Sequence, residues 1–131
     1  MILKRRRDKM KFYKCPICGN IIYLVEGNIN PVRCCGKEPE ELIANTVDAA
    51  TEKHVPVYEK DGDNINVKIG EIEHPMLDEH YIMFIAQVID NNVNIVKLKP
   101  SEKPVATFKY IKGAKLYEYC NLHGLWTNDV K

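Results

Sequence analysis

The sequence Asn64-Ile65-Asn66-Val67-Lys68-Ile69 alternates polar and apolar side chains at every position. Successive side chains of a β-strand point to opposite faces, so this pattern predicts a half-buried strand. Four further stretches rich in β-branched or aromatic residues also predict strands: residues 81–88, 92–98, 105–110 and 115–119. Short strands at this spacing, without a convincing long helix, predict an all-β fold in which an antiparallel sandwich occupies the chain from about residue 45.

The preceding segment, residues 11–41, is short, rich in turns and contains four of the five cysteines. Cys15 and Cys18 form a C-x2-C pair, and the vicinal pair Cys34 and Cys35 follows after fifteen intervening residues. A unit of this size cannot fold on apolar burial alone, so we expect a metal to stabilise it. Four thiolates favour zinc or iron, and coordination chemistry leaves the choice open. A vicinal disulfide would leave the unit without such a staple.

Composition sets the class and the expected compartment. With 131 residues, 45% hydrophobic and 28% charged, the chain is expected to be globular. The longest nearly apolar stretch, residues 81–89, is about half of a membrane span, so we expect no membrane partner. The basic start at residues 4–7 has no apolar segment behind it, which argues against a secretory signal. The expected location is therefore the cytoplasm, where thiols stay reduced and favour metal ligation.

The formal net charge of +1 conceals an asymmetry along the chain. Residues 1–14 contain seven Lys or Arg and one Asp, a balance of +6, so residues 15–131 carry −5. A nucleic-acid contact by this tail is one interpretation. A short basic terminus is more often a solvated end, so we expect no nucleic-acid partner.

One further cysteine and four histidines each lie at a predicted strand end or turn: His54, His74, His80, Cys120 and His123. The C-x2-H spacing of Cys120 and His123 lets one loop offer both ligands to one ion. A β-sandwich clusters its loops at its ends, which would bring the other segments nearby. A single histidine is more often a core or surface residue, so the residues alone leave a shared ion open.

Two sets of motifs carry a family resemblance. Residues 13–20, with Cys34-Cys35-Gly36, resemble the desulforedoxin module; the sequence departs from it at Glu38-Pro39-Glu40, where that family often has Met after the proline. Four blocks resemble the catalytic domain of the superoxide reductases: residues 52–56, 74–76, 79–80 and 119–126. In this order the blocks resemble the two-iron desulfoferrodoxin architecture. The resemblance implies a desulforedoxin-like, metal-stapled module followed by an immunoglobulin-like antiparallel β-sandwich.

The resemblance also implies domains and ligands. The expected segments are a basic tail (residues 1–9), a four-cysteine iron module with linker (10–44) and a catalytic sandwich (45–131). One iron is expected on four thiolates: Cys15, Cys18, Cys34 and Cys35. A second, catalytic iron is expected on four imidazoles and an axial thiolate: His54, His74, His80, His123 and Cys120.

The implied activity is superoxide reductase, the one-electron reduction of superoxide to hydrogen peroxide, with electrons from rubredoxin or a similar donor. The resemblance gives Lys53 the role of attracting superoxide and helping to supply a proton. It gives Glu52 the role of occupying the sixth iron position in the oxidised state and leaving it on reduction. It further implies a homodimer.

Other interpretations share these residues. One is a two-site iron protein that carries electrons without catalytic turnover. Another is a zinc-stapled binding module whose basic tail contacts nucleic acid, and a third is superoxide dismutation. Whether the four-cysteine iron relays electrons or only stabilises its module is also open.

Overall fold

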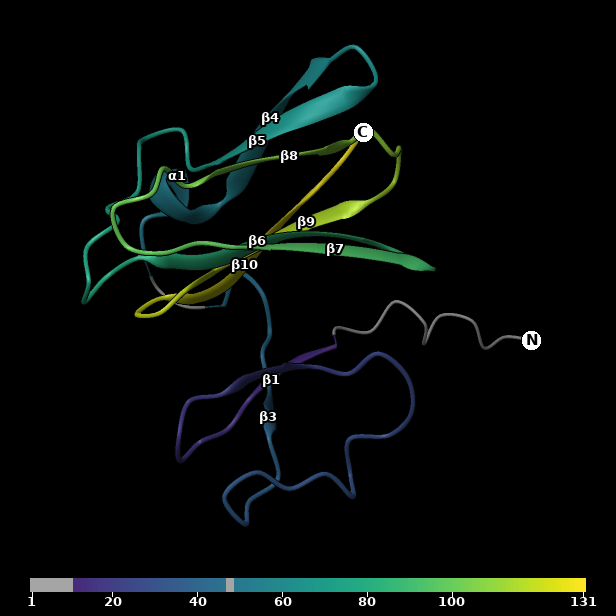
Figure 1. The fold of residues 1–131 in the computed structure, drawn as a ribbon, viewed down its shortest axis with the longest axis vertical. Helices are drawn as coiled ribbons and strands as arrows, with labels where there is room; N and C mark the ends of the chain where they lie inside the picture. Colours follow the sequence, from purple (N-terminus) through teal and green to yellow (C-terminus); the bar gives the residue numbers. More distant parts are fainter. Residues whose placement is uncertain (1–10, 47–48) are drawn as a thin grey trace. The chain divides into compact units, whose positions relative to one another are not determined.

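The computed structural model describes residues 11–46 and 49–131. The chain divides into two compact units, Met1–Ile43 and Ala44–Lys131 (Figure 1). The basic tail predicted for residues 1–9 lies outside the described residues.

The described part of the N-terminal unit contains a small antiparallel sheet. Its strands are β1 (Phe12–Lys14), β2 (Ile21–Tyr23) and β3 (Glu40–Glu41), in the order β2-β1-β3. The ring of Phe12 is buried and lies 4.9 Å from that of Tyr23. Three strands this short bury few apolar side chains, so loops and their cysteines make up most of the unit.

The C-terminal unit contains one short helix and seven strands among its described residues. They are α1 (Thr51–His54), β4 (Pro56–Asp61), β5 (Asn64–Ile69), β6 (Ile82–Ile89), β7 (Asn92–Lys97), β8 (Val105–Lys109), β9 (Lys115–Cys120) and β10 (Gly124–Asp129). The strands form two antiparallel sheets, ordered β10-β9-β6-β7 and β4-β5-β8. Figure 1 shows these sheets as the two layers of a sandwich.

The core of this unit lies between the two sheets and follows from the side-chain alternation. In β5 the burial alternates strictly, and Ile65, Val67 and Ile69 are at most 1% exposed. They pack with residues of the facing sheet, among them Ile85 and Leu116. Burying an isoleucine or valine side chain stabilises the fold by about 1.5–3 kcal/mol.

The structure confirms the predicted all-β class: a small metal-ligand-rich module precedes an antiparallel sandwich. Sheets of four and three strands, with β5–β6, β7–β8 and β8–β9 crossing between them, have the immunoglobulin-like arrangement. In the C-terminal unit all five predicted strands are present, and β4 and β10 are additional. No described helix has the length and hydropathy to cross a bilayer.

Candidate metal centres

The four cysteines of the N-terminal unit form one cluster. The Sγ atoms of Cys15, Cys18, Cys34 and Cys35 all lie within 4.8 Å of one another, and those of Cys18 and Cys34 are 3.7 Å apart. All are free thiols, so the vicinal pair does not form a disulfide. This arrangement suits four thiolates around one ion.

Two tight turns bring these sulfurs together. The first runs from Cys15 to Gly19, whose N–H donates to the Cys15 carbonyl at 3.1 Å and whose φ is +80°. In the second, Cys34 and Lys37 exchange both backbone hydrogen bonds, at 2.8 and 3.0 Å. The residues between them, Cys35 and Gly36, have φ of +53° and +75°. Positive φ at both central positions defines a type I′ turn, which places two adjacent cysteines at one corner.

The electrostatics of the cluster call for a cation. Backbone hydrogen bonds, first that from Cys18, lower the pKa of the Cys15 thiol to about 6. The side-chain hydrogen bond with Cys15 is the main cause that raises the pKa of Cys34 to about 12. Closely spaced thiolates repel one another, so one can ionise while the next resists. A bound metal ion removes this conflict because it stabilises all four thiolates.

The second cluster lies in the C-terminal unit and comprises His54, His74, His80, Cys120 and His123. One ligand atom from each lies within 4.8 Å of the others. The Nε2 of His54 is 3.1 Å from Nδ1 of His123 and 3.2 Å from Nε2 of His74, and Cys120 Sγ is 3.8 Å from His123 Nδ1. Four nitrogens and one sulfur therefore converge on one point.

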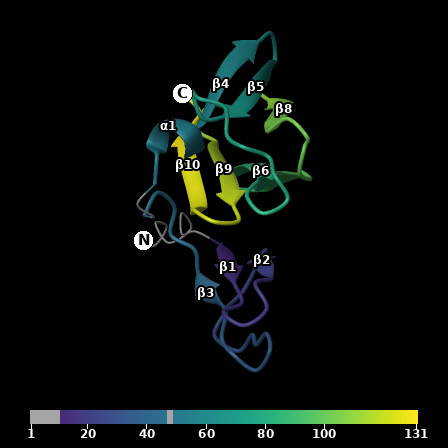
Figure 2. The ribbon, with the colours of Figure 1, turned by 90° about the vertical axis from the view of Figure 1, so that its left-hand side faces the viewer.

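The ends of several elements supply these ligands. His54 is the last residue of α1, His74 and His80 lie in the β5–β6 connection, and Cys120 ends β9. His123 stands in the turn that leads into β10. Figure 2 views this end of the sandwich, with α1, the β5–β6 connection and the β9–β10 turn facing the reader. The expected clustering of loops at one end of a sandwich thus accounts for the site.

The four imidazoles form a closed ring. Going round it, the ring centroids of His54, His74, His80 and His123 are separated by 4.7, 4.7, 5.0 and 4.9 Å. Each plane is inclined to the next by between 73° and 85°. Four imidazoles around one centre, with a thiolate as fifth ligand, fit a site that leaves one position open.

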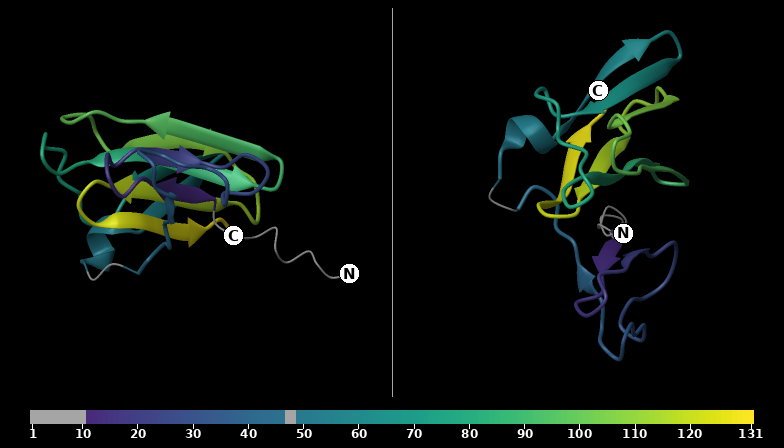
Figure 3. Two further views of the ribbon diagram at one scale, coloured as in Figure 1. Left: turned by 90° about the horizontal axis from the view of Figure 1, so that it is seen from below. Right: turned by 60° about the vertical axis from the view of Figure 1, so that its left-hand side comes forward.

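Hydrogen bonds and ring stacking outside the cluster fix the orientation of two of the imidazoles. The Nδ1 of His54 donates to the carbonyl of Ala50 at 2.8 Å, and that of His74 donates to the carbonyl of Pro75 at 2.7 Å. With Nδ1 protonated, Nε2 keeps its lone pair for a metal. His54 also stacks on Trp126 of β10 with ring centroids 4.9 Å apart, and Figure 3 shows α1 beside that strand.

The residues fit an iron ion by two observations. The Nε2 of His80 is buried without a hydrogen-bond partner in the described residues, which a metal would satisfy. Burial also lowers the pKa values of His54, His74 and His80, that of His74 to about 4, which favours the neutral form of these three imidazoles that metal ligation requires. Imidazole nitrogens with one thiolate suit iron.

Glu52 and Lys53 lie on α1 beside this cluster, and both side chains are exposed. Lys53 is close enough for its charge to lower the pKa values of His54 and His80. Neither residue is a member of the ligand cluster.

Some residues that shape the sites were not predicted. A Cβ on Gly70 would lie 2.6 Å from the carbonyl carbon of Lys53, and Gly70 has a φ of +77°. The available signal was a glycine directly after the alternating strand 64–69. Glu118 is fully buried in β9, two residues before Cys120, and its sequence setting gave no sign of this.

Together these sites define a protein with two metal centres, one of four thiolates and one of four imidazoles and a thiolate. The desulfoferrodoxin family model matches residues 46–129, and the model of the desulfoferrodoxin N-terminal domain matches residues 7–43. The chain belongs to the desulfoferrodoxin family. The resemblance found in the sequence is thereby confirmed, and the two clusters are consistent with the two iron sites of desulfoferrodoxins.

Individual relatives support this assignment over nearly the whole chain. Desulfoferrodoxin from Syntrophotalea carbinolica is 46% identical over 123 residues, covering 93% of this chain and 98% of the relative. Desulfoferrodoxin from Desulfarculus baarsii is 43% identical, covering 91% and 95%. The crystal structure of the superoxide reductase from Treponema pallidum superposes with a TM-score of 0.72 at 30% identity, covering 92% of this chain and 99% of that one.

Proposed function

We propose that the chain is a superoxide reductase that converts superoxide to hydrogen peroxide at the histidine-rich centre. The observation that carries this is the closed ring of four imidazoles with one thiolate. Five ligands leave one position of a six-coordinate iron open for a substrate, which a purely structural site avoids. Superoxide reductases among the matched proteins support the same activity.

The proposed ligand assignment follows the two clusters. The catalytic iron is held by His54, His74, His80, His123 and Cys120, within a catalytic domain of residues 45–131. The second iron is held by Cys15, Cys18, Cys34 and Cys35, within a module of residues 10–44. Iron bound at the first site supplies, when reduced, the single electron that superoxide takes up together with two protons to give hydrogen peroxide.

In this proposal the surrounding residues guide the anion and the protons. Lys53 contributes an exposed positive charge beside the cluster, on a body whose formal charge is −5 over residues 15–131. A local cation on a negative body attracts a small anion to one place on the surface. The Lys53 Nζ passes a proton to the reduced oxygen through water. With iron bound, the exposed Glu52 carboxylate would be available as a sixth ligand in the oxidised protein and would give up that position on reduction.

The four-cysteine iron is proposed to be an electron entry point as well as a staple. Cys18 and Cys35 are exposed, so a small donor such as rubredoxin can approach their sulfurs closely. The free state of all five cysteines also supports a reducing, cytoplasmic location. If electrons enter through this centre, the catalytic iron should be reduced more slowly in protein whose four-cysteine site holds zinc than in protein whose site holds iron.

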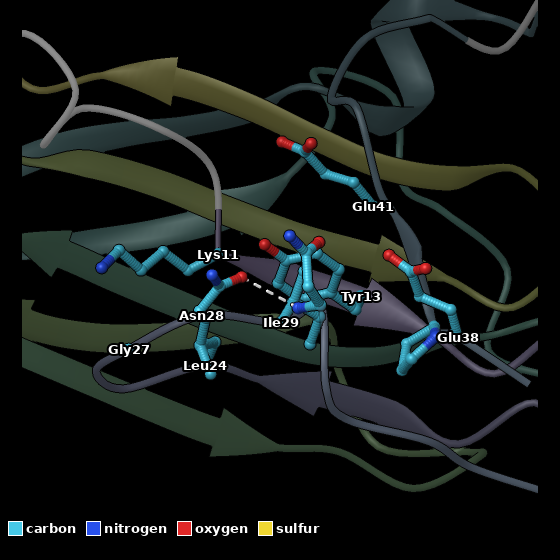
Figure 4. A pocket seen from close by; sticks show the side chains of 10 residues that line it. Lys11, Tyr13, Leu24, Gly27, Asn28, Ile29, Glu38 and Glu41 are labelled. Carbon is cyan, nitrogen blue, oxygen red and sulfur yellow. Dashed lines mark hydrogen bonds between the residues drawn. The ribbon is translucent and has the colours of Figure 1, made fainter.

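A homodimer through the N-terminal units is the proposed assembly. This unit has a surface hollow of about 540 Å³ lined by Lys11 near one edge and by Glu38 and Glu41 near the other (Figure 4). Opposite charges across one surface can pair with those of a two-fold-related copy. Lys11→Glu should therefore raise the proportion of monomer in sedimentation, and an unchanged association constant would argue against this interface.

The experiment that separates this function from a simple electron carrier uses ligand binding and iron content. Protein with two irons per chain is titrated with azide, and the absorption of the histidine-rich iron is followed. An open coordination position gives a saturable spectral change, which Cys120→Ser alters without removing the four-cysteine iron. A protein with two irons that binds no azide or cyanide would fit the carrier, and a colourless zinc protein would contradict both.

A further inference from the structure

The sulfurs of the four-cysteine cluster differ in the hydrogen bonds they accept. Cys15 Sγ accepts from the backbone N–H groups of Ile17 at 3.4 Å and Cys18 at 3.5 Å. Cys34 Sγ lies 3.6 Å from the side-chain Nδ2 of Asn20, within reach of an N–H···S hydrogen bond. The first two donors belong to the turn itself, whereas the third is a side chain that substitution can remove.

The backbone holds Asn20 in place for this contact. Its carbonyl accepts the N–H of Cys15 at 2.9 Å, which closes the turn of the C-x2-C pair. The next residue, Ile21, begins β2 and pairs with Lys14 of β1. The Asn20 side chain thus starts from a backbone fixed on both sides. Its nitrogen faces the sulfur, which is the favourable orientation because an amide oxygen would repel a thiolate.

A hydrogen bond to a thiolate changes the electron affinity of the bound metal. One-electron reduction of an iron held by four thiolates adds one negative charge, much of which the sulfurs share. Donors that point at those sulfurs stabilise the reduced form more than the oxidised form. Hydrogen bonds to the sulfurs are accordingly one of the features that set the reduction potentials of cysteine-ligated iron.

We propose that Asn20 is a tuning residue for the four-cysteine iron: its amide donates to the Cys34 thiolate and holds the reduction potential above the value that the backbone donors alone would give. This inference rests on the proposed iron at that site. Asn20 would then regulate how readily the module accepts an electron from a donor and passes it on.

The test compares reduction potentials in matched variants of the full two-iron protein. Asn20→Leu keeps a similar side-chain size and removes the donor, and Asn20→Asp replaces the donor with a negative charge. Asn28→Ala is the control, because Asn28 lies in the same unit and its Oδ1 accepts the N–H of Asn30 at 2.9 Å, away from the sulfurs. Iron content is measured first, and each potential is then taken from a redox titration of the sulfur-to-iron absorption bands.

The expected order of potentials is wild type above Asn20→Leu above Asn20→Asp, with Asn28→Ala equal to wild type. A net hydrogen bond predicts about a threefold to tenfold change in the equilibrium constant for reduction with Asn20→Leu, at most about 59 mV for one electron. The absorption bands should also move to lower energy as the sulfur loses its donor. Iron-loaded Asn20→Leu with an unchanged potential overturns the inference, whereas a wild-type module without iron overturns the proposed site instead.

Discussion

Gly70 is the clearest case in which one residue controls the position of the candidate catalytic segment. It has a φ of +77°, and its missing Cβ would meet the backbone of Glu52 and Lys53 at 2.6–2.7 Å. The N–H of Gly70 also donates to the carbonyl of Val55 at 3.0 Å. The α1 segment can therefore lie against β5 only because residue 70 has no side chain.

Gly70→Ala should destabilise the protein and slow its reaction with superoxide, because the added methyl displaces the Glu52–Lys53 backbone. Gly113→Ala is the matched control: Gly113 has a φ of +87° but nothing within 4 Å of the added Cβ. The unfolding free energy of the Gly113→Ala control should fall by about 1–2 kcal/mol, because alanine is disfavoured in this backbone conformation. The unfolding free energy of Gly70→Ala should fall by at least about 1 kcal/mol more than that, because its added methyl also clashes with the backbone of Glu52 and Lys53. Equal unfolding free energies of the two variants, measured in urea, would rule out the steric account.

The proposed role of the Lys53 side chain can be tested by removing its positive charge. Lys53→Ala should slow the second-order reaction with superoxide by about tenfold and flatten its dependence on salt, because the attraction for the anion is lost. Pulse radiolysis at several ionic strengths measures both quantities. Lys112→Ala, an exposed lysine in the turn before β9, serves as the control. An unchanged rate constant for Lys53→Ala would remove this residue from the mechanism.

At the scale of elements, the turn at residues 34–37 both supplies two candidate metal ligands and adopts a backbone conformation that costs free energy. It gives the N-terminal unit two adjacent ligands, and it places Cys35 in the left-handed region at a φ of +53°. A residue with a side chain is disfavoured there by about 1–2 kcal/mol. Metal ligation at the proposed site would offset this cost, so the turn and the ion would stabilise each other.

Loss of one thiolate should accordingly unfold the small module alone. In Cys35→Ser, amide protons of β1 and β3 should exchange much faster with solvent, while those of β6 and β9 stay protected. Hydrogen exchange followed by mass spectrometry measures both sets in one sample. If the β1 amide protons stay protected from exchange both in Cys35→Ser and after a chelator removes the metal, the metal does not stabilise the module.

The burial of Glu118 in β9 gives stability an unusual pH dependence. Both carboxyl oxygens are buried without a hydrogen-bond partner in the described residues, and burial raises the pKa well above its usual 4.5. The unfolded chain ionises near that usual value while the folded chain stays protonated. The contribution of Glu118 to stability is therefore complete below about pH 4.5 and is lost as the pH rises above it.

Glu118→Gln should remove this loss and raise the melting temperature at pH 8 relative to wild type, with little difference near pH 4.5. Thermal unfolding of the metal-free protein, followed by circular dichroism across this range, is the measurement. Glu59→Gln, at an exposed position of β4, controls for a general change in charge. Parallel stability curves for wild type and Glu118→Gln would show that Glu118 ionises normally.

The sequence predicted elements wherever local pattern determines them. The strict alternation of polar and apolar residues predicted β5 from the sequence, and the cysteine spacing predicted the small N-terminal module. By contrast, β4 begins at Pro56 and ends in exposed charged residues, so it lacks a strand pattern. It forms because it pairs with β5 along its whole length, from Pro56 opposite Ile69 to Asp61 opposite Asn64.

The same limit applies to the sites. The histidines could be grouped from their positions at strand ends and from the family resemblance. Their order around the ring depends on how α1, the β5–β6 connection and the β9–β10 turn meet in space. Contacts such as Gly70 against Lys53, or Asn20 against Cys34, join segments that carry no local signal for each other.

At the scale of the whole molecule, the chain combines a small four-cysteine unit with a β-sandwich that contains the histidine-rich cluster. Residues 15–131 carry a formal charge of −5, yet superoxide is an anion, so we propose that the positive charge of Lys53 on α1 attracts it. A reductase consumes one external electron for each superoxide and releases peroxide, whereas a dismutase needs no donor and releases oxygen.

The most direct test mixes the reduced two-iron protein with a known amount of superoxide and measures peroxide and oxygen together. The account predicts one hydrogen peroxide and one consumed iron electron for each superoxide, no oxygen, and oxidation of the histidine-ligated iron before any electron leaves the four-cysteine iron. Oxygen release with half as much peroxide, or oxidation of the four-cysteine iron without earlier oxidation of the histidine-ligated iron, would contradict it.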